Sequence, residues 1–117
     1  MNGPSAFSWL DIFFHEALRE DGKREFFDHA LELLRRIKLD IHTRTVVFGN
    51  VAAMERREAI IAQFLCKWET IGPPAPNDRT QFYVELTTLE YVLSAYCNMR
   101  FFFRANDYKN EVWKPFE

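Results

Sequence analysis

The sequence predicts an all-α protein, a bundle of four helices in one domain with an extended aromatic tail. Apolar residues recur at helical spacing in four segments, and Gly or Pro residues lie between most of these segments. No internal repeat is present, and 117 residues are the size of a single domain, 1–117. Short loops favour antiparallel neighbours in such a bundle.

The first two helices are predicted over residues 8–20 and 23–38. Ser8 precedes the first apolar stripe and is a suitable N-cap residue. Asp11 and His15 occupy the side of the helical wheel opposite that stripe. Asp21 and Gly22 end this helix, and a second apolar arc then begins.

Residues 39–49 are predicted to form an extended connection. Ile41, Thr43, Thr45 and Val47 alternate with other residues as in a strand, and all four are β-branched. One strand alone has no partner, so an extended segment is the simplest interpretation. The alternative fold class is α+β, with a small hairpin near residues 41–48.

The second half of the chain predicts two longer helices. Asn50 can cap a helix over residues 51–71, and the Pro-rich connector 72–78 ends it. The last helix is predicted over residues 79–105. The tail, 106–117, has no apolar period and is expected to be extended.

Composition excludes several functional classes. Charged residues make up 27% of the chain and the net charge is −2, so it is not a generic polyanion binder and no nucleic acid is expected as a partner. No apolar run reaches the length of a membrane span. The N-terminal residues have no basic region and reach Asp11 early, so no secretory signal is expected, and two cysteines suit reduced thiols. We expect an intracellular, cytoplasmic protein; import into an organelle without a cleaved presequence stays open.

The last predicted helix is apolar on two sides. Phe82, Leu86, Leu89 and Leu93 form a core stripe, while a second apolar group lies across the helical wheel. A helix of a four-helix bundle faces water on one side, so the second group needs a covering. Large exposed apolar surfaces usually mark interaction sites, and aromatic residues are favoured anchors in them.

Aromatic residues also crowd the end of the chain. The rings of residues 101–103 span about 200° of a helical wheel and cannot all enter one core. We therefore predict a surface that binds another protein or a second copy of this chain; the alternative is that the tail folds back over it. Its candidate residues are Val84, Tyr91, Ala95, Met99, Phe101, Phe102, Tyr108, Trp113 and Phe116.

Two arginines fall on predicted core stripes. Arg57 lies between Phe64 and Trp68 on the wheel, and Arg100 lies in line with Phe82. A buried charge must be paired or bind a ligand. Arg57 and Arg100 are thus candidates for a buried charge or an anion site; pairing within the chain, or a stem that reaches water, is the alternative.

The sequence shows no metal or cofactor motif. Three histidines and two cysteines lack zinc-ligand spacing, and four glycines do not form a phosphate-binding loop. Arg24 and His29, Arg36 and His42, and Arg35 and His42 each match an Arg-x4-6-His spacing. This spacing resembles the motif of the helical HEPN ribonucleases, which would imply a ribonuclease or a toxin–antitoxin component.

The favoured function is that of a non-enzymatic interaction module, such as a small helical subunit, an adaptor or an inhibitor. The two-sided last helix and the aromatic tail favour it, and no constellation of catalytic residues competes strongly. The HEPN-like ribonuclease is the alternative.

Overall fold

The computed structural model describes residues 7–19, 24–48, 51–97 and 105–113. In these ranges the chain forms only helices and short connections, so the predicted all-α class is confirmed. The helices are α1 (Trp9–Leu18), α2 (Arg24–Phe48), α3 (Val51–Ile71), α4 (Arg79–Cys97) and α5 (Ala105–Trp113), with a 3-10 turn, η1 (Pro76–Asp78).

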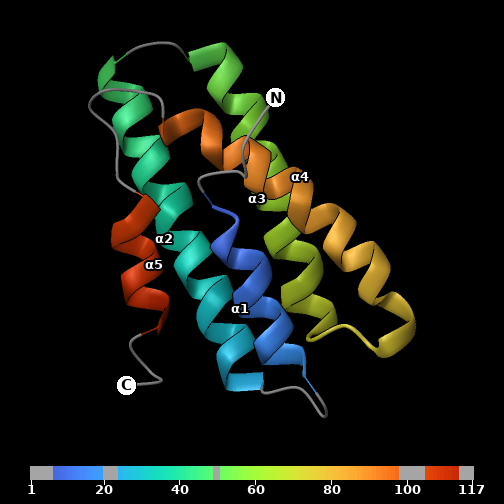
Figure 1. The fold of residues 1–117 in the computed structure, drawn as a ribbon. Coiled ribbons are helices and arrows are strands. Elements are labelled where there is room, and N and C mark those ends of the chain that lie inside the picture. Colours follow the sequence, from blue (N-terminus) through green and yellow to red (C-terminus); the bar gives the residue numbers. More distant parts are fainter. Residues whose placement is uncertain (1–6, 20–23, 49–50, 98–104, 114–117) are drawn as a thin grey trace, which may run out of the picture.

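The first four helices form a ring in which each packs against two others. α1 contacts α2 and α4, and α3 contacts the same two helices from the other side. Successive helices run in alternating directions, which gives the antiparallel neighbours expected from short loops (Figure 1). α5 packs against α2, outside this ring.

Phe82 of α4 is the point at which the core side chains of four helices meet. Its side chain is fully buried. The ring lies 5.1 Å from Phe14 of α1, 5.8 Å from Phe27 of α2 and 4.9 Å from Trp68 of α3, measured between ring centroids. The contacts with Phe14 and Trp68 are edge-on, an arrangement that the aromatic quadrupole favours. Phe64 of α3 completes the cluster at 5.7 Å.

The prediction of an extended segment over residues 39–49 is wrong for its described part, and so is the alternative hairpin near 41–48. α2 continues through Phe48, ten residues past its predicted end at 38. Ile41 follows Ile37 by one helical turn, and both side chains are fully buried. The burial of Ile41 therefore maintains the helical period where the β-branched residues suggested a strand. The Thr43 hydroxyl donates to the Leu39 carbonyl at 2.9 Å, the bond to the residue four positions earlier that a threonine inside a helix can form.

The prediction of an extended tail over residues 106–117 is also wrong for its described part. α5 spans Ala105–Trp113, and two polar contacts attach it to α2. The Tyr108 hydroxyl donates to Asp40 at 3.3 Å, and its half-buried ring packs against the core. Glu111 forms an ion pair with Arg36.

The helix boundaries otherwise follow the predictions closely. The third helix has the expected limits of 51 and 71, and Ser8 occupies the N-cap position of α1 without a side-chain cap bond. Gly72 ends α3 with φ of 85° while its N–H donates to the Trp68 carbonyl at 2.8 Å, a left-handed conformation that glycine adopts without strain. Residues 98–104, which include most of the predicted end of the last helix, lie outside the described part of the chain.

The aromatic cluster predicts a large loss of stability on truncation of Phe82. Phe82→Ala should lower the free energy of unfolding by about 3–5 kcal/mol, because it removes the ring that contacts three other helices. Val84→Ala, two residues away and 58% exposed, should change it by no more than about 0.5 kcal/mol. Chemical denaturation of both variants measures the difference, and similar losses would contradict the placement of Phe82 at the centre of the core.

Candidate functional site

The side of α4 turned away from the core carries exposed apolar residues. Val84 is 58% exposed and Tyr91 is 69% exposed, whereas Leu86, Leu89 and Leu93 are fully buried. Thr88 lies between Val84 and Tyr91 at helical spacing and is exposed. Ala95 follows Tyr91 by one helical turn and is half-buried. We call Val84, Thr88, Tyr91 and Ala95 the outer face of α4.

The described tail does not cover this face. α5 packs against α2, and Figure 1 shows it on the side of the bundle away from most of α4. Tyr108, predicted among the partner-binding residues, is held by Asp40 of α2 instead of lying beside Val84 or Tyr91. Val84 and Tyr91 therefore share one surface, and Tyr108 lies apart from it.

The other predicted partner-binding residues fall outside the description. Met99, Phe101, Phe102 and Phe116 lie in undescribed segments. Trp113 belongs to α5, but its side chain is not among the described ones. The predicted surface is thus represented by Val84, Tyr91 and Ala95.

A groove between α3 and α4 borders the outer face. It encloses about 370 Å³. Phe64, only 5% exposed, lies at its base, and Ile60 of α3, 37% exposed, lies across from Val84 and Thr88 of α4. Ile60 is partly exposed, whereas its neighbour Ile61 is fully buried, so Ile60 lies at the edge of the buried face of α3.

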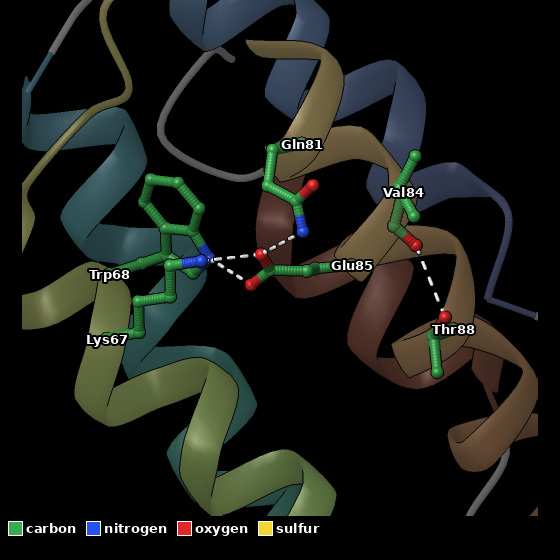
Figure 2. Close-up of polar contacts among 6 residues, drawn as sticks. All are labelled: Lys67, Trp68, Gln81, Val84, Glu85 and Thr88. Atoms are coloured by element: carbon green, nitrogen blue, oxygen red, sulfur yellow. Dashed lines mark hydrogen bonds and ion pairs between the residues drawn. The ribbon is translucent and has the colours of Figure 1, made fainter. Parts of the chain in front are cut away.

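Part of the groove is lined by a polar network centred on Glu85, shown in Figure 2. The Glu85 carboxylate accepts hydrogen bonds from Lys67 at 2.6 Å, Gln81 at 2.8 Å and the Trp68 indole at 3.1 Å. Partial burial acts to raise the pKa of Glu85, but these three donors outweigh burial, and the pKa is lowered. The carboxylate therefore stays charged and links α3 to α4.

Arg57, one of the two predicted buried-charge candidates, lies partly exposed on α3. Its side chain is half-buried on α3, near the fully buried Tyr96 of α4. Burial raises the pKa of Tyr96 to about 12, the charge of Glu58 adds to this, and the charge of Arg57 opposes it. Arg57 thus sits among charges and a phenol of its own chain. Arg100, the other arginine of this prediction, lies outside the described residues.

A second polar cluster, between α1 and α4, is absent from the predictions. Glu90 is 6% exposed, and its carboxylate accepts a hydrogen bond from the backbone N–H of Asp11 in the first turn of α1. Burial raises the pKa of Glu90 to about 7, with a further contribution from the Asp11 charge. Nearby, the His15 ring stacks on Tyr83 at 4.2 Å and approaches Asp11 at 3.7 Å.

The pKa of a second group in this cluster, the Tyr83 hydroxyl, is also shifted. Burial raises its pKa to about 12, the charge of Asp11 contributes in the same direction, and Arg79 opposes both. The burial of the Glu90 carboxylate depends on the position of the α1 N-terminus, which the sequence of α4 alone does not reveal. A single glutamate near the end of a core stripe does not by itself indicate a contact between that residue and another helix.

The Arg-x4-6-His residues are distributed over two regions. Arg24 is exposed and forms an ion pair with Asp28 at 3.6 Å, whereas the His29 ring is half-buried, 6.5 Å from the Phe13 ring. Arg35 and His42 instead line one groove of about 530 Å³ between α2 and α3. This groove also contains Lys38, the exposed Leu39, Cys66 and Glu69.

Arg35 and His42, the two motif residues in that groove, both lie beside acidic side chains. Arg35 forms ion pairs with Glu32 and Glu69, and His42 lies 3.4 Å from Glu58. In the described ranges, no three His, Cys, Asp or Glu side chains gather as they would around a metal ion. None of the helices in those ranges has the length and apolar character needed to cross a membrane.

Comparison with known protein families, with curated proteins and with solved structures finds no match for this chain.

The environment of Glu90 predicts a pH-dependent stability. Since its pKa rises from 4.5 to about 7 on folding, the folded chain retains a proton there that the unfolded chain loses. The free energy of unfolding should therefore fall by about 1–3 kcal/mol as pH rises from about 4.5 to about 7. Glu90→Gln, which cannot ionise, should remove most of this slope.

Denaturation curves of the wild type and Glu90→Gln at several pH values test this. Glu85→Gln is the matched control, because the pKa of Glu85 is lowered and its removal should leave the slope in this window in place. Identical pH slopes for wild type and Glu90→Gln would contradict the burial of the Glu90 carboxylate.

Proposed function

We propose that this protein is a non-enzymatic interaction module that docks onto a partner protein through the outer face of α4 and the adjacent α3–α4 groove. It would act as a small helical subunit, an adaptor or an inhibitor. The observation that carries the proposal is the joint exposure of Val84 and Tyr91 beside an apolar groove.

The composition of this surface supports a protein partner. Tyr91 presents a ring and a hydroxyl, the combination that protein interfaces favour in their anchoring residues. From Val84 to Ala95, the exposed residues of α4 are uncharged. Charged groups are depleted at the centres of protein interfaces, so this surface fits such a centre.

The electrostatics of the groove also fit this proposal. The charge of Glu85 is balanced by Lys67, so a partner that covers this part of the groove does not meet an uncompensated charge. Gln63, Gln81 and Thr88 offer uncharged polar groups around an apolar base. Surfaces of this kind accept an apolar helix or loop with a few hydrogen bonds at its edge.

A double substitution on the outer face should weaken binding strongly and leave the fold intact. Val84→Glu with Tyr91→Glu places two charges at the centre of the docking surface, and affinity for the partner should fall by about 30-fold or more, as expected for loss of an anchor worth about 2 kcal/mol. Partners retained by the tagged protein are identified by mass spectrometry and their affinities measured by titration.

The matched control for this test is Ile12→Glu. Ile12 is an apolar residue of α1, 59% exposed, so the substitution has the same chemistry at a different surface. It should retain the partners of the wild type. Partners lost equally with Ile12→Glu, or kept by the double variant, would count against the proposal.

A HEPN-like ribonuclease is the second candidate function. The observation that favours it is that Arg35 and His42, at Arg-x6-His spacing, line the same groove. The interaction proposal expects no RNA cleavage. Cleavage that is lost in His42→Ala and in Arg35→Ala but kept in His29→Ala would establish the ribonuclease and overturn the interaction proposal as the main function.

A further inference from the structure

The residues of the outer face of α4 have a palindromic spacing. Val84, Thr88, Tyr91 and Ala95 are separated by four, three and four positions. This is the alternation of the apolar seam in a helix that packs lengthwise on another helix. Because the spacing reads the same in both directions, a second α4 in antiparallel orientation presents the same seam in register.

The side-chain sizes along this seam complement each other under a two-fold rotation. An axis midway between Thr88 and Tyr91 places Val84 opposite Ala95 of the second copy, and Thr88 opposite Tyr91 of the second copy. Each large side chain then faces a small one. Alternating large and small residues across facing positions is the arrangement that fills the space between two helices.

The charges allow the same pairing. Beside the seam, the rotation sets Glu85 opposite Ser94 and Thr87 opposite Val92, so no like charges face each other. Glu85 is moreover paired with Lys67 within its own chain at 2.6 Å. The net charge of each copy is only −2, which leaves little long-range repulsion between them.

The dimensions are sufficient for a dimer. α4 has 19 residues and is about 29 Å long. α4 and the neighbouring part of α3 around Ile60 together form a strip about 20 Å wide. A second copy that covers this strip along the length of α4 would bury about 600 Å² on each chain. This area lies at the lower end of the range for specific interfaces, which predicts a reversible dimer.

We infer that the occupant of the outer face of α4 is α4 of a second copy of this chain, packed antiparallel about a two-fold axis between Thr88 and Tyr91. This inference rests on the proposed function, because it names the partner of the same surface. An isologous contact of this kind closes after two copies and does not propagate.

Sedimentation equilibrium over a wide concentration range tests the inference. The wild type should approach twice the chain mass of 14.0 kDa, and so should Ile12→Glu. Tyr91→Glu should remain at 14.0 kDa with an unchanged helical circular dichroism spectrum, because it places a charge in the seam. A wild type that stays at 14.0 kDa throughout, or a dimer that Tyr91→Glu leaves intact, would overturn it.

Thiol cross-linking tests the antiparallel orientation. Thr88 and Thr80 are both exposed residues of α4. With Cys66 and Cys97 replaced by Ser, Thr88→Cys lies close to the axis, so a short bis-maleimide should join two copies. The two residues at position 80 should be about 28 Å apart along the helices, so Thr80→Cys should not cross-link. Equal cross-linking at both positions would overturn the antiparallel arrangement.

These results separate the inference from the proposed function. A monomeric wild type that binds another protein, and loses it with Val84→Glu and Tyr91→Glu, would overturn the second copy as occupant and leave the docking surface in place. A monomer whose binding is unaffected by that double substitution would overturn both.

Discussion

Burial of Phe82 fixes how α4 is rotated about its own axis, and that rotation determines which of its residues face outward. The ring contacts Phe14, Phe27 and Trp68 from three other helices, so α4 cannot turn without breaking the core. Nine helical residues span about 900°, so Tyr91 necessarily points away from Phe82. The exposure of Tyr91 is therefore a consequence of core packing.

Two carboxylates of α4 reinforce this orientation in opposite ways. Glu85 links α4 to the Trp68 indole and to Lys67, and its charge is stabilised there. Glu90 meets the N-terminal turn of α1, where burial disfavours its charge. The helix is therefore held by one ionised contact on the α3 side and by a pH-sensitive contact on the α1 side, while its outer face remains free of charge.

The sequence was sufficient to predict that the first four helices exist and that α4 has two apolar sides, because both follow from periodicity within one segment. It failed where contacts between distant segments decide the structure. The β-branched residues after Leu39 suggested a strand until the burial of Ile41 showed that the helix continues. Likewise, α5 depends on Asp40 and Arg36, which lie about 70 positions earlier in the chain. The burial of Glu90 could not be foreseen, since it requires the position of α1.

Hydroxyl-radical footprinting of the tyrosines at low and high protein concentration tests the central claim, that α4 buries one face and offers the other for docking. At low concentration Tyr91 should be oxidised rapidly and the fully buried Tyr96 slowly. At high concentration Tyr91 should become protected, while the oxidation of the exposed Ile12 stays unchanged. A Tyr91 protected even at the lowest concentration would show that its own chain covers it, and would contradict the account.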